Sequence, residues 1–238
     1  MKVKVKNYST KKCADSIFGQ IEHKQCGWGW ISLNKKRQKL LQAQSSTGMV
    51  FKDYKKTRHN PVIILILESP HCDEFGDKNH PCAACGTSGR NIFDYLCDIF
   101  NHSTNSNVKY KYNSSDLRTY LNKHEKDIID VFVVNSVQYQ CSLGITPICN
   151  FIKESNWIDE WYSSRNNFLA RLKNISSKND CFIINMCTKG VFLPMKEIVY
   201  DLLDSNNIIQ SNYCEWPHPS SWERLKHVEI KQPISNKQ

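Results

Sequence analysis

Three polar side chains suited to acid–base chemistry and base recognition each follow an apolar stretch of this 238-residue chain: Glu68, Asn135 and His218. Glu68 stands directly after six consecutive apolar residues (62–67), and the other two follow later apolar runs. A carboxylate can orient water or stabilise a cation, an amide offers both donor and acceptor, and an imidazole can stabilise a leaving anion. Taken singly, each residue also has an ordinary explanation as a solvated turn, a strand-end cap or a surface histidine.

The elements that would position these residues alternate along the chain. Short apolar runs bounded by polar residues predict strands at 62–67, 128–134, 181–184 and 208–216. Apolar residues at helical spacing predict helices at 90–100, 115–125, 157–175 and 196–203. Such alternation predicts an α/β fold of three layers, α/β/α, around a central, mainly parallel four-stranded sheet. Ligands bind outside the carboxyl ends of parallel strands, so Glu68, Asn135 and His218 are expected to converge in one cleft.

The twenty-residue connection after the first strand is rich in Pro, His, Cys, Asp and Gly, which is typical of a functional loop. Within it, Cys82 and Cys85 form a Cys-x-x-Cys pair. Together with His71, Cys72 and His80, these thiols could hold a structural zinc ion. No second Cys-x-x-Cys pair completes the set, so we predict no metal and no cofactor.

Positive charge is concentrated at the start of the chain. Residues 1–60 carry 14 Lys and Arg against 3 Asp and Glu, whereas residues 61–238 carry 18 against 20. A basic segment with interleaved aromatic residues indicates nucleic-acid binding, and the aromatic residues here are Trp28, Trp30, Phe51 and Tyr54. We therefore predict DNA as the partner, and a basic N-terminal extension (1–60) packed on a main domain (61–238). The alternative is ordinary solubilising lysine.

Whole-chain features bear on where the protein works. No apolar run approaches the length of a membrane span, and the first six residues, Met-Lys-Val-Lys-Val-Lys, lack the apolar core of a signal peptide. The eleven cysteines are then expected to be reduced thiols. We expect a cytoplasmic monomer with no membrane partner.

Four segments resemble, in order and spacing, the motifs of the uracil-DNA glycosylase superfamily. They are 67–71 (Leu-Glu-Ser-Pro-His), 86–96 (Gly-Thr-Ser-Gly-Arg-Asn-Ile-Phe-Asp-Tyr-Leu), 131–137 (Val-Phe-Val-Val-Asn-Ser-Val) and 218–220 (His-Pro-Ser). The resemblance implies a DNA glycosylase, which flips a base out of the helix and hydrolyses its N-glycosidic bond to leave an abasic site. The paired cysteines of the iron–sulfur branch are not matched here, so no cluster is carried over.

The resemblance also implies roles for single residues. Glu68 would stabilise the cationic sugar, or orient or deprotonate the attacking water, with His71 or Asp73 as substitutes. His218 would stabilise the departing base as a hydrogen-bond donor. The positions implied to contact DNA are Ser69, Pro70, Ser88, Gly89, Arg90, Pro219, Ser220, Ser221 and Trp222. Trp222 is expected to be either a wedge inserted into the duplex or a core residue.

The base is expected to meet Asn135, which matches the family residue that bonds the flipped base, with His71 and Phe75 beside it. Relatives in the iron–sulfur branch carry a Pro-Phe pair where this chain has a proline followed by Cys-Ala-Ala-Cys (82–85). Small residues leave room for a substituent, so we predict a bulky modified pyrimidine, as in viral genomes, and a role in defence against phage DNA. If Phe75 or Tyr139 supplies the missing ring, uracil is the expected base.

Two other classes of function use the same residues. One is a non-catalytic DNA-binding module that grips a flipped or damaged base and tolerates the loss of Glu68. The other is a hydrolase of free nucleosides, which would leave the basic N-terminal segment without a purpose.

Overall fold

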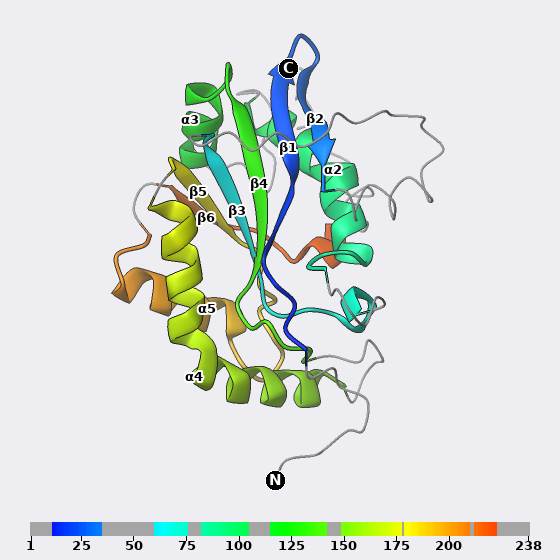
Figure 1. The fold of residues 1–238 in the computed structure, drawn as a ribbon, viewed down its shortest axis with the longest axis vertical. Coiled ribbons are helices and arrows are strands. Elements are labelled where there is room, and N and C mark those ends of the chain that lie inside the picture. Colours follow the sequence, from blue (N-terminus) through cyan, green and yellow to red (C-terminus); the bar gives the residue numbers. More distant parts are fainter. Residues whose placement is uncertain are drawn as a thin grey trace, which may run out of the picture.

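The computed structural model describes residues 11–34, 60–75, 82–104, 115–141, 149–177, 179–209 and 212–222. These residues form one mixed six-stranded sheet with helices on both faces (Figure 1). The strands are β1 (Ser16–Lys24), β2 (Gly27–Leu33), β3 (Val62–Leu67), β4 (Ile128–Asn135), β5 (Cys181–Asn185) and β6 (Tyr213–Glu215). The helices are the 3-10 turn η1 (Cys72–Phe75), α2 (Thr87–Thr104), α3 (Ser115–Lys123), α4 (Cys149–Ser176) and α5 (Met195–Ser205).

The strand order is β2-β1-β4-β3-β5-β6. β3 pairs in parallel with β4 and β5, and β5 pairs in parallel with β6, whereas β1 is antiparallel to both of its neighbours. The predicted α/β class is confirmed. The predicted four-stranded sheet is wrong, because an N-terminal hairpin adds two antiparallel strands. The last parallel strand is also shorter than predicted and covers only Tyr213–Glu215.

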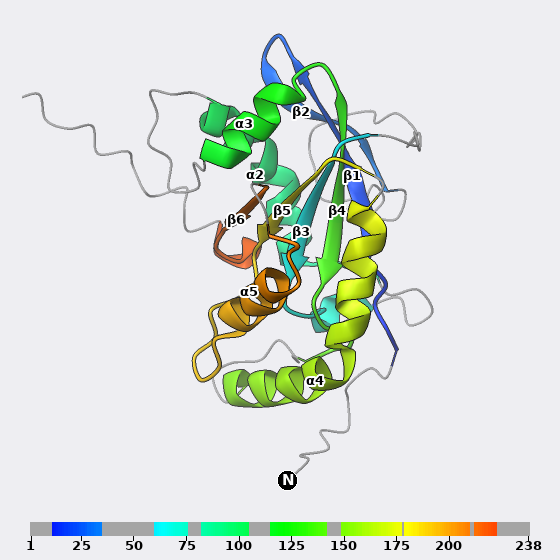
Figure 2. The same ribbon diagram turned by 90° about the vertical axis from the view of Figure 1, so that its left-hand side faces the viewer.

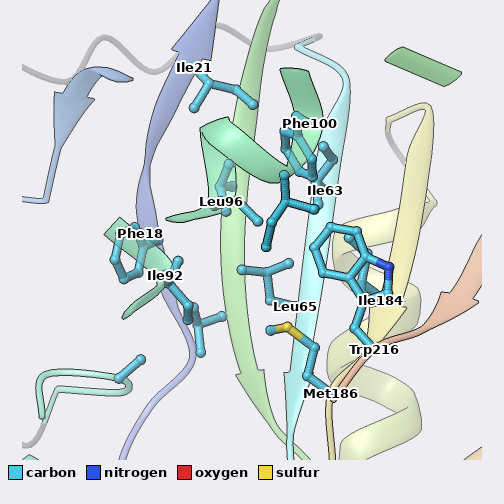
Figure 3. Packing of buried hydrophobic residues seen from close by; sticks show 14 of the residues in the cluster. Phe18, Ile21, Ile63, Leu65, Ile92, Leu96, Phe100, Ile184, Met186 and Trp216 are labelled. Atoms are coloured by element: carbon cyan, nitrogen blue, oxygen red, sulfur yellow. The ribbon is translucent and has the colours of Figure 1, made fainter. Parts of the chain in front are cut away.

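The sheet separates two hydrophobic clusters, so the molecule has the three layers that the sequence predicts. α2 and α3 pack on one face, and α4 and α5 supply the cluster on the other face (Figure 2). β3 lies between β4 and β5, and all six of its residues are buried. Its side chains alternate between the faces: residues 63, 65 and 67 meet the α2 layer (Figure 3), and residues 62, 64 and 66 meet the α4 layer. An uninterrupted apolar strand is stable here because both faces are covered.

The N-terminal hairpin belongs to the main sheet, and the division into an extension (1–60) and a main domain (61–238) stays a prediction. β1 lies between β2 and β4. Asn101 of α2 holds the hairpin, since its Oδ1 accepts the Trp28 N–H at 2.5 Å and its Nδ2 donates to the Trp28 carbonyl at 3.2 Å. Trp28 is buried, and half-buried Trp30 donates its indole N–H to the Phe93 carbonyl at 2.9 Å. Trp28 thus lies in the hydrophobic core and Trp30 packs against it, while DNA binding by this segment stays a prediction. The other two predicted aromatic residues, at 51 and 54, lie outside the described residues.

Helix α4 begins at Cys149, eight residues before the predicted start, and it is bent near its middle (Figures 1 and 2). Ser163 and Ser164 lie there, and both hydroxyls donate to the Glu160 carbonyl, at 2.9 and 2.7 Å. Such bonds back to the preceding turn bend helices. We call 149–162 the first arm, which lies beyond the carboxyl ends of the parallel strands. The second arm, 163–176, packs on the sheet face.

Two further expectations concern thiols and membranes. The cysteines whose side chains the structure describes are all unbridged. Burial raises the pKa of the Cys141 and Cys181 thiols to about 12, which keeps both protonated at neutral pH. Within the described parts of the chain, no helix combines the length and apolarity needed to cross a bilayer.

The start of α2 depends on a glycine. A Cβ on Gly89 would lie 1.7 Å from the carbonyl oxygen of Ala84, and Ala84 itself has a φ of 52°. The turn before α2 therefore touches the first turn of the helix, a close backbone approach that requires glycine. Packing explains Gly89, which is buried, without a contact to DNA.

We expect Gly89→Ala to lower the free energy of unfolding by about 2–3 kcal/mol, because the added methyl group overlaps backbone atoms. Gly29→Ala is the matched control, since nothing lies within 4 Å of a Cβ at that position of β2. Its effect should stay within about 0.5 kcal/mol. Urea denaturation measures both, and equal stabilities of the two variants would contradict the close contact.

Candidate active site

The main chain of Glu68 is fixed just beyond the end of β3. Its carbonyl oxygen accepts hydrogen bonds from the Ser136 hydroxyl at 2.6 Å, the Trp157 indole at 2.9 Å and the Val137 N–H at 3.0 Å. The donors come from the segment after β4 and from the first arm of α4. Glu68 is only 3% exposed, so it is not a residue of a solvated turn.

The carboxylate of Glu68 is compensated by a lysine that the sequence analysis missed. Lys153, on the first arm of α4, donates from Nζ to Oε1 at 2.5 Å. Thr188, three residues after β5, donates its backbone N–H to Oε2 at 3.3 Å. The predicted helix started at Trp157 and left Lys153 outside. One more helical turn places Lys153 four residues earlier on the same face, and that spacing is the signal that could have found it.

Glu68 and Lys153 hold each other in their charged forms. Burial by itself would raise the pKa of Glu68, but His218 and Lys153 outweigh it and hold this pKa well below the ordinary value of 4.5. Burial would lower the pKa of Lys153, but the Glu68 carboxylate raises it. The pair is therefore ionised at neutral pH. A carboxylate with so low a pKa is a poor proton acceptor, so Glu68 suits stabilising a cation or orienting water better than deprotonating it.

His218 is presented by a turn in which three successive carbonyl groups accept hydrogen bonds. The donor and acceptor pairs are the Trp222 indole and Pro217 at 3.0 Å, the Ser221 N–H and His218 at 3.0 Å, and the Asn91 amide and Pro219 at 2.8 Å. Trp222 is buried and packs edge to face against Trp216, with ring centroids 6.0 Å apart. The expectation that Trp222 is a wedge for DNA is therefore wrong, because its ring is a core support of the His218 turn.

The imidazole of His218 lies beside the carboxylate, with Nε2 at 3.4 Å from Glu68 Oε2. Its Nδ1 accepts the Ser220 N–H at 3.3 Å and lies 2.7 Å from the hydroxyl of the same serine. Nδ1 is therefore the unprotonated nitrogen of the neutral ring, and Nε2 carries the proton. Burial lowers the pKa of His218, with nearby lysines and His71 adding to this effect and Glu68 opposing it, so the ring is neutral at pH 7. The Nε2 contact is longer than a strong hydrogen bond, which suits a donor that turns toward a substrate.

Glu68 and His218 meet at the place in the sheet where the order of the parallel strands reverses. β3 is followed in the chain by β4 on one side, and the chain then crosses back to place β5 on the other. The switch point between β3 and β5 is where α/β sheets form a crevice for ligands. Glu68 after β3, Thr188 after β5 and His218 after β6 gather at this switch point.

Asn135 ends β4 at the same edge of the sheet, opposite Leu67 in the parallel register. It is fully buried, and among the described residues neither Oδ1 nor Nδ2 has a hydrogen-bond partner. An unmet buried polar atom costs about 1–3 kcal/mol, which is typical of a group retained for a ligand. Alternation along β4 places this side chain on the α2 face, whereas the Glu68 carboxylate meets α4. The structure thus joins Glu68 to His218 and places Asn135 at the neighbouring strand end, without a hydrogen bond to either.

The residues predicted to contact DNA differ in exposure. The buried residues are Pro70, Gly89, Pro219 and Trp222, the half-buried residues are Ser69, Ser88 and Ser221, and the exposed residues are Arg90 and Ser220. Apart from the wedge role of Trp222, contact with DNA stays a prediction for these residues.

The long loop after β3 contains the other predicted base contacts. Phe75 is buried in the same hydrophobic cluster as the alanines at 83–84. Its contact with a base and the enlarged pocket both stay predictions. His71 is half-buried and close enough to His218 to disfavour its protonation. The side chain of Asp73 lies outside the described residues.

The zinc alternative concerns the same loop. Among the described residues, no three His, Cys, Asp or Glu side chains lie close enough together to hold a metal ion. The Cys82 and Cys85 thiols lie 3.9 and 4.0 Å from the Ala83 carbonyl oxygen. His80 and the side chain of Cys72 lie outside the described residues.

No protein-family model, no curated protein and no solved structure matches this chain. The assignment of function therefore rests on the residues of the site and on the ordered motifs.

Asn135→Leu should raise the free energy of unfolding by about 1 kcal/mol, because leucine has a similar volume and removes two unmet polar atoms. Asn185→Leu is the matched control. Asn185 is also fully buried at a strand end, but its amide bonds the Lys196 carbonyl, the Tyr213 hydroxyl and the Cys187 N–H. Asn185→Leu should lower the free energy of unfolding by about 2–3 kcal/mol, because it leaves these partners without a hydrogen bond. Chemical denaturation distinguishes the two, and a destabilised Asn135→Leu would mean that its amide has structural partners.

Lys153→Met should lower the free energy of unfolding by about 3–5 kcal/mol at neutral pH, because it leaves an uncompensated buried carboxylate. Lys123→Met is the control, since Lys123 pairs with Asp180 at the surface and its side chain is 63% exposed. Lys123→Met should lower the free energy of unfolding by less than about 1 kcal/mol.

The loss caused by Lys153→Met should also depend on pH. In the wild type, the pKa of Glu68 is below its unfolded value, so the stabilisation is present above about pH 4.5 and is lost as the pH falls through the folded pKa. In the variant Lys153 no longer opposes burial, so the pKa of Glu68 is higher than in the wild type. The gap in stability between the two proteins therefore widens as the pH rises from the folded pKa of the wild type to that of the variant, and denaturation followed from acid to neutral pH should show the smallest gap at the acid end. A gap independent of pH would contradict the ion pair.

Proposed function

We propose that the protein is a DNA glycosylase that hydrolyses the N-glycosidic bond of a flipped-out base. The observation that carries this proposal is the contact between Glu68 and His218 at the switch point of the sheet. Glu68 follows the first parallel strand in the chain, and His218 follows the last. Both residues match motifs of the uracil-DNA glycosylase superfamily, in the order of that family.

The two groups suit the charges that develop in the reaction. When the C1′–N bond breaks, its electron pair leaves with the base and positive charge develops on the sugar. The Glu68 carboxylate, kept ionised by Lys153, stabilises the sugar cation and orients the water that adds to C1′. The Nε2–H of His218 donates a hydrogen bond to the anionic base. The attacking water releases its proton to solvent, because Glu68 is too weak a base to take it.

Asn135 supports the same proposal from the neighbouring strand. Its buried, unpartnered amide offers the donor and acceptor that read the edge of a base. A base reaching this amide would satisfy both polar atoms and recover their cost.

Two classes of base remain candidates. The sequence favours a bulky modified pyrimidine, as in phage DNA, and a role in defence. Uracil is the second candidate, because Phe75 or Tyr139 would then supply the ring that stacks on the base.

The test incubates the protein with duplexes that carry uracil, 5-hydroxymethylcytosine or its glucosylated form, followed by alkali to break abasic sites. We expect strand cleavage at one class of base, and His218→Ala and Asn135→Leu should each slow single-turnover cleavage by about 10²-fold or more. Folded variants that cleave at the wild-type rate would show that the site is elsewhere. DNA binding without cleavage of any duplex would favour the non-catalytic module, and hydrolysis of free nucleosides alone would favour the nucleoside hydrolase.

A further inference from the structure

Three of the most exposed large apolar side chains in the described residues form one cluster: Phe151 (63% exposed), Val191 (67%) and Phe192 (62%). The rings of Phe151 and Phe192 meet edge to face, with centroids 5.8 Å apart and planes at 83°. Phe151 lies at the start of α4, and Val191 and Phe192 lie in the connection from β5 to α5 (Figure 2). Exposed apolar clusters of this kind mark interaction sites.

Phe151 and Phe192 lie on the two segments that also bind the Glu68 carboxylate, which are the start of α4 and the connection from β5 to α5. Phe151 stands two residues before Lys153, whose Nζ binds the Glu68 carboxylate. Phe192 stands four residues after Thr188, whose N–H binds the same carboxylate. Lys153 and Thr188 also contact each other, with Nζ 3.4 Å from the hydroxyl. The same two segments therefore carry both the exposed phenyl rings and the groups that bind the Glu68 carboxylate.

The connection that carries Phe192 is held in one conformation by a buried carboxylate. Glu154 of α4 accepts the backbone N–H groups of Val191, Phe192 and Leu193 at 2.6, 2.7 and 2.6 Å. Gly190 has a φ of 77°, and a Cβ there would lie 1.9 Å from the Leu193 carbonyl oxygen. The three hydrogen bonds to Glu154 and the positive φ that Gly190 adopts thus hold the connection that presents the Phe192 ring to solvent, so little ordering entropy is lost there when a partner binds.

The chemistry of the surroundings favours a nucleobase over an apolar protein surface. Lys189 is exposed in the same connection, two residues before Val191. Aromatic rings next to a lysine are the combination that binds a base and its phosphate.

We propose that Phe151 and Phe192 receive the base next to the flipped-out nucleotide and hold it unstacked. The inference rests on the proposed function to the extent that the ligand is DNA. The phenyl rings fill the gap left by the extruded base or stack on its neighbour, while the strand passes Lys189 and enters the Glu68–His218 site.

The test uses a duplex with a tetrahydrofuran abasic analogue and 2-aminopurine as its neighbouring base, so that neither the identity of the target base nor cleavage enters the measurement. Binding of the wild type should raise the 2-aminopurine fluorescence, because the base is unstacked. Phe192→Ala and Phe151→Ala should each weaken binding by roughly 5- to 100-fold and abolish most of the fluorescence rise. Both side chains are exposed, so the variants should stay folded.

Two further variants sharpen the result. Tyr162→Ala removes an equally exposed aromatic ring (67%) eleven residues along α4 from Phe151, and should change binding by less than about twofold. Gly190→Ala removes no ring but disturbs the connection, and should weaken binding as Phe192→Ala does.

Wild-type binding and fluorescence in both phenylalanine variants would overturn the inference, even if base excision is intact. A wild-type dimer that Phe192→Ala dissociates would also overturn it, because the pair would then be a contact between two copies. Fluorescence that depends on Phe192 in a protein that excises no base would support the inference and refute the glycosylase.

Discussion

The ion pair between Lys153 and Glu68 is the interaction on which the site depends. A carboxylate buried beyond the central strand would be protonated and neutral without a positive charge beside it. Lys153 supplies that charge from a helix that is 85 residues away in the sequence. The same helix binds the main chain of Glu68 through Trp157. The first arm of α4 is therefore positioned by both the side chain and the backbone of one residue. The net stability gained from such a buried pair is small, because both charges lose their hydration, so its main effect is to fix the geometry of this edge.

Two asparagines end the parallel strands on either side of β3 and differ in their hydrogen bonds. Asn185 ends β5 with every polar atom of its amide bonded, and it ties β5 to α5 and β6. Asn135 ends β4 with both polar atoms of its amide unmet among the described residues. The amide of Asn185 therefore stabilises the fold, whereas we expect the unmet amide of Asn135 to lower its stability. A ligand that forms hydrogen bonds with the Asn135 amide would remove this cost.

The parts of the fold that follow from local pattern could be predicted from the sequence, and the parts that depend on distant contacts could not. Six apolar residues in a row need two covered faces, so β3 and the position of Glu68 at its end could be inferred. The pairing of β1 with β4 could not, because the hairpin is fixed by contacts such as the Asn101 amide on Trp28. Trp222 fits a wedge or a core residue equally well by type, and only its burial against Trp216 decides between them. Lys153 was missed because the helix start was placed one turn too late.

The bend in α4 has a mechanical consequence for the edge of the sheet. The second arm is packed against the sheet face, and Arg171 there donates to the Asn135 carbonyl. The first arm carries Phe151, Lys153 and Glu154, which reach the exposed rings, the carboxylate and the connection after β5. The bend does not detach the first arm from the core, because Trp157 and Trp161 are buried in the same cluster as Phe168 of the second arm. A force on the phenyl rings would therefore reach the carboxylate through Lys153 and the sheet face through these two indole rings.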